Sequence, residues 1–335
     1  MKTLLLSADE IGKAAEIIKR GGLVGMPTET VYGLAADALN GKAVASIFRA
    51  KGRPMDNPLI VHISDISQIK PLVKEFPEKA RILAEKFWPG PLTMILPRSE
   101  LIPEEVSAGL DTVAIRFPGN EIARKLISMS SPLAAPSANL SGSPSPTNAR
   151  HVMDDMEGRI DAVIDGGECA IGLESTVITL AEEPPRILRP GGITAGQLRE
   201  AIGEIVIDPA VTHPLEKDAK AASPGMKYKH YSPKAELILL RGSSQAYIDY
   251  VNSSPEEGVT ALCYEEDMDK LKKPVIAVGP ANDLETQAHN LFSALREADK
   301  TDARIIYAHC PEKHGIGLAV YNRIIRAAAF RIIEV

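Results

Sequence analysis

Residues 25–63, GMPTETVYGLAADALNGKAVASIFRAKGRPMDNPLIVHI, decide the fold of this chain. The apolar run at residues 23–26 predicts a strand, and a polar turn rich in threonine follows it directly. A short helix ending in Arg49, Lys51 and Arg53 comes next, and residues 59–63 then predict a second strand, which carries His62. Strand, helix and strand in this order indicate an α/β fold.

The same stretch carries a local excess of positive charge. Four basic residues and no acidic one lie between Asp37 and Asp56, whereas the whole chain has a formal net charge of −6. Lys51 and Arg53 can converge on one phosphate, since arginine offers a planar fork and lysine a movable point charge. An ordinary solvated loop is the alternative. Asn57, Pro58 and His62 follow at once on a predicted strand rather than on a polar helix, and this favours the phosphate site over a solvated loop.

The composition is that of an ordinary globular protein, with 335 residues, 44% of them hydrophobic and 24% charged. This length favours two domains. Only 4% of the residues are aromatic. Together with the negative net charge, this argues against stable nucleic-acid binding. Cys169, Cys263 and Cys310 lie far apart, which suggests neither a zinc site nor disulfides and indicates a cytoplasmic location. No segment approaches the roughly 20 apolar residues of a membrane span.

Hydrophobic patterns divide the chain into a large α/β sheet domain at residues 1–207, a linker at 208–234, and a small Rossmann-like domain at 235–335. In the first domain a capping box of Ser7 and Glu10 begins a helix that ends at Gly21. Further helices are predicted at 77–88, 120–129 and 147–156, and further strands at 92–96, 113–117, 162–164, 176–180 and 186–188. After the linker, strands at 236–240, 259–263, 275–278 and 304–308 alternate with helices at 244–252, 283–298 and 318–330. This alternation predicts a doubly wound parallel sheet.

Polar residues follow several of these strands, where open α/β sheets usually contact ligands. Thr28 and Thr30 follow the first strand, although they are also compatible with a simple turn. In LAAPSANLSG (133–142), Ser137 and Asn139 offer short polar groups for phosphate or ribose, or they merely cap the next helix. Arg116 is either a solvent-facing charge on an edge strand or a carboxylate clamp. No P-loop and no G-x-G-x-x-G motif occurs, so ATP would need an open cleft of loops.

Six motifs, in order along nearly the whole chain, resemble the threonylcarbamoyl-AMP synthase family. They are PTETVYGL (27–34), KGRPMDNPL (51–59), APSANLSG (135–142), ESTV (174–177), ILRPG (187–191) and SPGMKYKHYSP (223–233). The first domain resembles the YrdC-like catalytic domain, which implies a large twisted open sheet with a concave cleft. The linker and last domain resemble the extra part of the two-domain form, mainly through GIGLAVYNRIIRAA (315–328).

The resemblance implies a nucleotidyltransferase that makes threonylcarbamoyl-AMP and pyrophosphate from L-threonine, bicarbonate or CO₂, and ATP. Its product would serve threonylcarbamoyladenosine formation next to the anticodon of tRNAs that read ANN codons. The downstream tRNA threonylcarbamoyl transferase machinery is therefore the expected partner. Mg²⁺ is expected with ATP, and no protein ligand for it can be assigned, because no carboxylate cluster identifies one.

The resemblance also assigns site residues. Threonine is expected at Thr30, His62, Arg116, Ala135 and Ser175, with Arg116 clamping its carboxylate. The nucleotide is expected at Lys51, Arg53, Asn57, Thr112, Ser137, Asn139, Ser145, Arg189 and His230, and Lys51 and Arg53 are the expected catalytic residues. Residues 223–233, with Lys227, Lys229, His230 and Tyr231, are further predicted to fold over the nucleotide as a lid that excludes water.

Two other classes of protein remain open at this level. One is an RNA-binding protein that grips duplex tRNA with the basic segment, which would show a steep salt dependence of tRNA affinity without ATP turnover. The other is a carbamoyl-transfer or hydrolase module that acts on carbamoyl phosphate and works without threonine.

Overall fold

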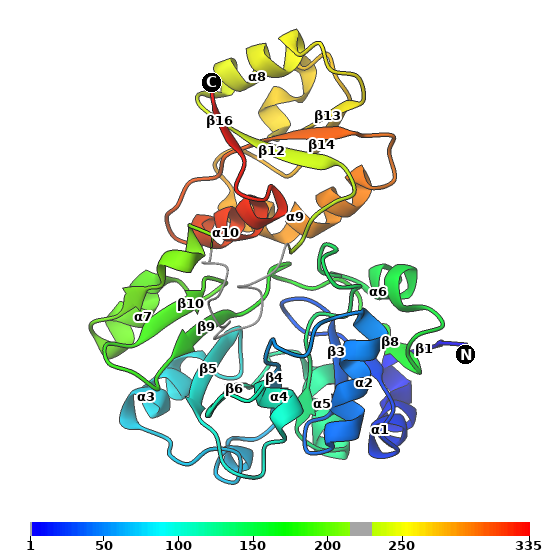
Figure 1. The fold of residues 1–335 in the computed structure, drawn as a ribbon, viewed down its shortest axis with the longest axis vertical. Coiled ribbons are helices and arrows are strands. Elements are labelled where there is room, and N and C mark those ends of the chain that lie inside the picture. Colours follow the sequence, from blue (N-terminus) through cyan, green and yellow to red (C-terminus); the bar gives the residue numbers. More distant parts are fainter. Residues whose placement is uncertain (1, 215–229) are drawn as a thin grey trace.

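The computed structural model describes residues 2–214 and 230–335. Its strands form an 11-stranded sheet and a five-stranded sheet, each packed against helices (Figure 1). The prediction of an α/β fold with a large open sheet and a smaller second sheet is confirmed. The domain ranges 1–207, 208–234 and 235–335 stay a prediction, and the change from one sheet to the other falls between Ile207 and Glu236.

The larger sheet is mixed, with parallel neighbours such as β4 and β6 and antiparallel ones such as β2 and β3. Its strand order is β1-β8-β2-β3-β7-β4-β6-β5-β9-β10-β11. The strands are β1 Leu4–Leu6, β2 Val24–Met26, β3 Gly33–Asp37, β4 Ile60–His62, β5 Leu92–Pro97, β6 Thr112–Arg116, β7 Leu133–Ala134, β8 Ala162–Ile164, β9 Thr176–Thr179, β10 Arg186–Arg189 and β11 Val206–Ile207. The helices with them are α1 Ile11–Lys19, α2 Gly41–Lys51, α3 Glu78–Phe87, α4 Glu104–Ser107, α5 Glu121–Met129, α6 Ala149–Met156 and α7 Ala195–Ile202.

Alternation along β3 separates two hydrophobic cores, because successive side chains of a strand point to opposite faces of the sheet. Leu34 and Ala36 belong to the core that includes α2, whereas Ala35 belongs to the core that includes α1 and α5. The sequence patterns located α1, α2 and α5 but not β3. Its sequence, GLAAD, has none of the β-branched or aromatic residues that favour strands.

The turn between β2 and β3 and the end of α2 position the candidate site. Met26 pairs with Gly33 in an antiparallel register, so the polar residues between them form the tip of a hairpin. Helix α2 begins after Asn40, whose side chain accepts a hydrogen bond from the Ala43 amide, and ends at Gly52 with φ 61°. A left-handed residue at this point stops a helix, so the chain turns away immediately after Lys51.

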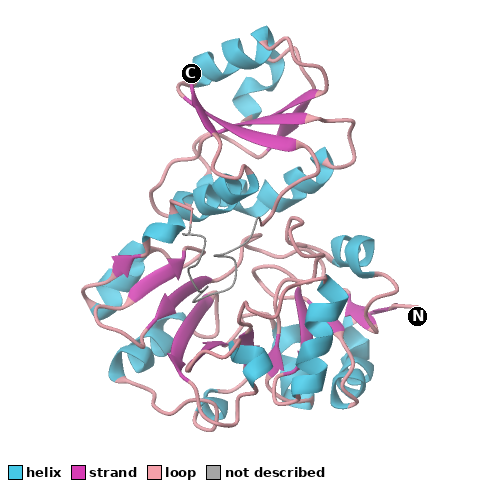
Figure 2. Cartoon of the chain, viewed as in Figure 1, coloured by secondary structure: helices cyan, strands magenta, loops and turns pink. Residues whose placement is uncertain are grey.

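The smaller sheet is parallel throughout, in the order β14-β13-β15-β12-β16. Its strands are β12 Glu236–Arg241, β13 Val259–Cys263, β14 Val275–Ala277, β15 Ile305–His309 and β16 Ile332–Glu334. Figure 2 shows the sheet between helix α8 (Ser244–Ser253) on one face and α9 (Leu284–Ala298) and α10 (Gly317–Ala327) on the other. The doubly wound arrangement is thus confirmed, and only the final strand β16 escaped the sequence patterns.

Helices α9 and α10 lie between the small sheet and the larger domain (Figure 1). They contribute buried arginines that bond to the larger domain, including Arg296 to Asp155 and Arg323 to Glu174. Within residues 2–214 and 230–335, no helix is both long enough and apolar enough to cross a membrane.

Candidate active site

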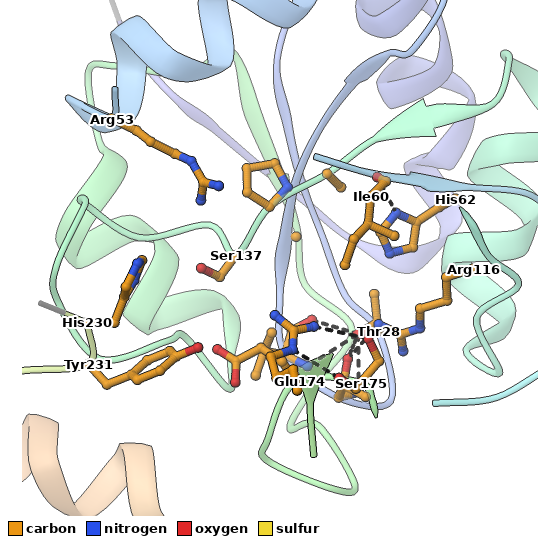
Figure 3. Close-up of a pocket in the computed structure, with 16 residues that line it drawn as sticks. Thr28, Arg53, Ile60, His62, Arg116, Ser137, Glu174, Ser175, His230 and Tyr231 are labelled. Carbon is orange, nitrogen blue, oxygen red and sulfur yellow. Dashed lines mark hydrogen bonds between the residues drawn. The ribbon is translucent and has the colours of Figure 1, made fainter. Parts of the chain in front are cut away.

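An open pocket of about 580 Å³ lies between the larger sheet and the residues that lead into the smaller one. Nine of the predicted site residues line it: Thr30, Arg53, His62, Arg116, Ala135, Ser137, Ser175, Arg189 and His230. In Figure 3 the residues predicted to bind the nucleotide, Arg53, Ser137 and His230, stand on one side, and His62 and Arg116 stand on the other. The five predicted threonine residues all lie at this pocket; their roles stay a prediction.

Two neighbouring parallel strands place the residues predicted to hold threonine. His62 ends β4 and Arg116 ends β6, and the two are register partners. Both are buried in the middle of the sheet, with Arg116 only 4% exposed, so the alternative of a solvent-facing charge on an edge strand is wrong. Side chains at the shared ends of parallel strands meet at one edge, where small ligands commonly bind.

Arg116 already has protein partners. Its Nη2 lies 2.7 Å from Oε1 of Glu29, and its Nη1 donates to the Thr30 hydroxyl at 2.9 Å. Burial is the largest single effect and would raise the pKa of the Glu29 carboxyl, but the charge and hydrogen bond of Arg116, together with backbone hydrogen bonds, bring the pKa below its ordinary value. A substrate carboxylate would therefore meet an arginine whose charge Glu29 partly balances. The sequence motif contained Glu29 but gave no reason to assign it this role.

The two histidines of the pocket are electrically neutral. Burial, followed by repulsion from Arg116, lowers the pKa of His62 to about 3. Burial and nearby cations, Arg53 first, lower the pKa of His230 to about 3. The Nδ1 of His62 lies 3.2 Å from the carbonyl of Ile60.

Lys51 is buried rather than part of a solvated loop. It is 3% exposed, and its Nζ donates to the carbonyls of Ser137 and Asn139, at 2.5 and 2.6 Å. Burial, with repulsion from Arg53, lowers its pKa well below the ordinary value. Lys51 therefore holds the backbone at Ser137, which lines the pocket, and at Asn139, while Arg53 reaches the pocket itself (Figure 3).

The remaining predicted nucleotide residues are not among those that line the pocket. Asn57 and Asn139 are buried, and Ser145 is buried and donates a hydrogen bond to Glu174. Thr112 stands at the first position of β6, four residues from Arg116, or roughly 13 Å at the rise of a strand. The assignment of these four residues to ATP stays a prediction. Thr112 lies at the end of β6 that is opposite to the pocket-lining Arg116.

Several buried polar atoms near the pocket have no hydrogen-bond partner among the described residues. They include both amide atoms of Asn57, Oδ1 of Asn139 and Nε2 of His230. Buried polar groups are normally paired, so unpaired ones beside a pocket are suited to bind a polar ligand. The two carboxylates at the pocket, Glu29 and Glu174, each face an arginine. They are therefore poor candidates to hold Mg²⁺, and no cluster of three or more metal-binding side chains occurs in the described part of the chain.

Glu174 is the main lining residue that sequence reasoning did not assign. One of its carboxylate oxygens accepts a hydrogen bond from Ser145, and the other accepts one from Arg323 of the smaller domain. Next to it, Ser175 accepts from Arg189 at 3.2 Å and shares a hydroxyl contact of 2.8 Å with Thr93. The motif ESTV located this strand, but Arg323 lies 149 residues away, and no local pattern points to it.

Only part of the predicted lid can be described. Lys227 and Lys229 lie outside the described residues. His230 and Tyr231 line the pocket, and the Tyr231 ring packs 5.2 Å from that of Phe292 in α9. The lid itself stays a prediction.

The fold and the pocket define the class: an α/β protein of two sheets with an arginine-lined pocket at strand ends of the larger one. A family model described as telomere recombination (Sua5/YciO/YrdC) matches residues 16–191. A second, described as the C-terminal domain of threonylcarbamoyl-AMP synthase, matches residues 193–329.

Relatives extend over nearly the whole chain. A threonylcarbamoyl-AMP synthase of Pyrococcus abyssi is 50% identical over 96% of this chain and 95% of its own length. The one from Bacillus subtilis is 45% identical over 97% of this chain and 94% of its own length. The crystal structure of P. abyssi Sua5 complexed with L-threonine aligns with a TM-score of 0.92 at 46% identity and covers 100% of both chains. The chain belongs to the threonylcarbamoyl-AMP synthase family.

Proposed function

We propose that this chain is an L-threonylcarbamoyladenylate synthase, which makes threonylcarbamoyl-AMP and pyrophosphate from L-threonine, bicarbonate or CO₂, and ATP. The observation that carries the proposal is the match over the full length to P. abyssi Sua5 complexed with L-threonine. The arginine-lined pocket supports it independently, since it offers hydroxyls, neutral imidazoles and cations to an amino acid and a triphosphate.

The residues suit a reaction that depends on positioning and charge. The amine of threonine combines with bicarbonate to give a carbamate and water, and a carbamate oxygen then attacks the α-phosphorus of ATP, releasing pyrophosphate. The carbamate is already an anion, so this step needs no general base, in agreement with His62 and His230, whose pKa of about 3 makes both very weak bases. Arg53 and Arg189 would offset the charge that develops on the phosphates. Burial lowers the pKa of Arg189 to about 10, which leaves it cationic at neutral pH.

The finer parts of the proposal rest on the family resemblance. They are the class of nucleotidyltransferase, bicarbonate as carbon source, Mg²⁺ arriving with ATP, a cytoplasmic location, and delivery of the product to the tRNA threonylcarbamoyl transferase machinery. We further propose the threonine and nucleotide residues assigned above, with Lys51 and Arg53 as the catalytic pair.

The test is pyrophosphate release from ATP with threonine and bicarbonate each present or omitted, combined with mass spectrometry of the product. We expect release that requires both co-substrates, and a product with the mass of threonylcarbamoyl-AMP. Release that is independent of threonine would contradict the proposal and favour a carbamoyl-transfer module. Salt-sensitive binding of tRNA without any ATP turnover would favour the RNA-binding alternative.

A further inference from the structure

The smaller domain sends one arginine to the edge of the pocket. Arg323 of α10 is 0% exposed. Its Nε donates to Oε2 of Glu174 at 2.7 Å, and its Nη2 donates to the Glu174 carbonyl at 3.1 Å. Its Nη1 donates to the carbonyl of Pro190 at 2.9 Å. One guanidinium therefore joins Glu174, two residues before β9, to Pro190, the residue just after β10.

The carboxylate that Arg323 holds faces the pocket. Glu174 is a lining residue, and Figure 3 shows it between Tyr231 and Ser175. Its second oxygen, Oε1, accepts a hydrogen bond of 2.5 Å from the hydroxyl of Ser145. The neighbouring Arg189 bonds to both the carbonyl and the hydroxyl of Ser175. Glu174 thus lies among Ser145, Arg189 and His230, all of which the proposed function assigns to ATP.

We propose that Arg323 is a positioning residue of the smaller domain, which neutralises and orients Glu174 so that the phosphates of ATP can bind beside it. The inference rests on the proposed function for the identity of the ligand. It assigns the smaller domain a direct part in nucleotide binding, although Arg323 itself does not line the pocket.

Charge explains why the arginine is needed. Burial would raise the pKa of Glu174, but the charges of Arg323 and then Arg189, with the Ser145 hydrogen bond, lower it below its ordinary value. The other titratable groups that act on Glu174 are Lys51, His230 and Tyr231. Without Arg323, an incompletely balanced buried carboxylate would repel a triphosphate, or would have to take up a proton first.

Geometry explains why the residue is arginine. Its three nitrogens reach three acceptors on two segments of the larger domain, and Nη1 also donates to Oδ1 of Asn322. Reaching both segments at once requires a rigid fork. A lysine at position 323 would keep the charge but could not hold both segments in the same way. R323K should therefore fall between the wild type and R323M.

The experiment measures binding of a non-hydrolysable ATP analogue by isothermal titration, at pH 6 and pH 8, to the full-length wild type, R323M, R323K and E174Q/R323M. At pH 8 we expect R323M to bind at least about tenfold more weakly than the wild type, a factor equal to roughly 1.4 kcal/mol. Loss of Arg323 should raise the pKa of Glu174, so that this carboxylate takes up a proton more readily at pH 6. The ratio of the dissociation constants of R323M and the wild type should therefore be smaller at pH 6 than at pH 8. E174Q/R323M, which has no carboxylate to neutralise, should recover most of the affinity at both pH values.

A matched control is R296M. Arg296 of α9 also bonds to the larger domain, 2.8 Å from Asp155 and 2.6 Å from the carbonyl of Pro144, but neither Asp155 nor Pro144 lines the pocket. R296M should weaken contact between the domains and leave affinity for the analogue within about threefold of the wild type, less than the ~1.4 kcal/mol of a tenfold change. The inference is overturned if R323M binds as tightly as the wild type, if E174Q/R323M is as weak as R323M, or if R296M and R323M lose affinity equally.

Failure of the proposed function would look different. A wild-type protein that binds the analogue but releases no pyrophosphate with threonine and bicarbonate contradicts the synthase assignment, and the comparison of variants still decides the role of Arg323. A wild-type protein that does not bind the analogue at all overturns both.

Discussion

At the scale of single residues, the pocket combines permanent cations with groups that burial holds neutral. His62 and His230 both have a pKa of about 3, far below the ordinary value of a histidine. Neither can carry a positive charge near neutral pH, so the charge of the phosphates must be met by other side chains, Arg53 and Arg189 among them. Activity between pH 6 and 8 should accordingly show no step from the titration of either histidine.

The depressed pKa of His62 predicts a loss of stability in acid. The unfolded histidine gains a proton below pH ~6.5 and the folded one does not, so the free energy of unfolding falls as the pH falls from there. For H62N this contribution is absent. Between pH 6.5 and 4.5 the free energy of unfolding of H62N should therefore fall by roughly 2–3 kcal/mol less than that of the wild type. Urea unfolding at each pH measures the difference, with H213N, at an exposed histidine, as control. Parallel curves for H62N and the wild type would contradict the prediction.

Lys51 predicts a combined loss of structure and activity. K51M removes both donors to the carbonyls of Ser137 and Asn139 and leaves those buried acceptors unpaired, at a cost of about 1–3 kcal/mol for each. If Lys51 also stabilises transition-state charge, kcat should fall about 100-fold. Pyrophosphate release and thermal unfolding measure the two effects. K42M is the control, since Lys42 is exposed on the same helix, and equal activity of the two variants would show the prediction to be wrong.

At the scale of elements, the close approach of two chain segments fixes the end of the pocket. A Cβ on Gly191 would lie 2.4 Å from the amide nitrogen of Thr176 and 2.6 Å from the carbonyl oxygen of Glu174. Only glycine fits here, because both neighbours are backbone atoms that cannot move aside. This contact holds the end of β10 against the start of β9, and thereby holds Arg189 against Ser175.

G191A should therefore be destabilising and should weaken catalysis. We expect a loss of about 1–3 kcal/mol in the free energy of unfolding, the usual cost of overpacking, and a lower kcat/KM for ATP as Ser175 moves away from Arg189. G12A is the matched control, because the nearest atom to its new Cβ, on Met129, is 3.8 Å away. Alanine is the better helix former by up to about 1 kcal/mol, so G12A should be at least as stable as the wild type. Unfolding of G191A at the wild-type temperature would refute the close-contact argument.

Elements with a clear apolar pattern could be predicted from the sequence, and those without one could not. Helix α2 and strand β4 were predicted because their apolar residues recur with the right period. The strands β3 and β11 were missed, since one is built of small residues and the other has only two residues. Their place comes from pairing with neighbours in the sheet, and single-sequence patterns do not contain that information.

At the scale of the whole molecule, the candidate site shows the same limit. Motifs predicted nine of the residues that line the pocket, because those residues lie in short conspicuous segments at strand ends. The pairing of Glu174 with Arg323 could not be predicted, since it forms only when the two sheets come together. Contacts between domains carry no local signal in the chain, even where they shape the site.

Buried contacts between the two sheets predict that the chain unfolds as one unit. Arg296, Asn322, Arg323 and Arg326 are all buried; Arg296 and Arg323 donate hydrogen bonds to the larger domain, and Asn322 and Arg326 donate to the carbonyls of Val211 and Ala210 just after it. An ATP analogue at 100 times its Kd should stabilise the folded chain by about 2.7 kcal/mol. We therefore expect a single calorimetric transition that moves as a whole to higher temperature when the analogue is added.

The variant R296M tests this coupling. It leaves Asp155 without its arginine and should destabilise the contact between the two domains by roughly 3–5 kcal/mol. If the interface couples the domains, R296M should broaden or split the transition, and only the part that belongs to the catalytic domain should respond to the analogue. Two separate transitions in the wild type, with one indifferent to the analogue, would mean that the domains fold independently. In that case the smaller domain could act on the pocket only through local contacts such as that of Arg323, and not through shared stability.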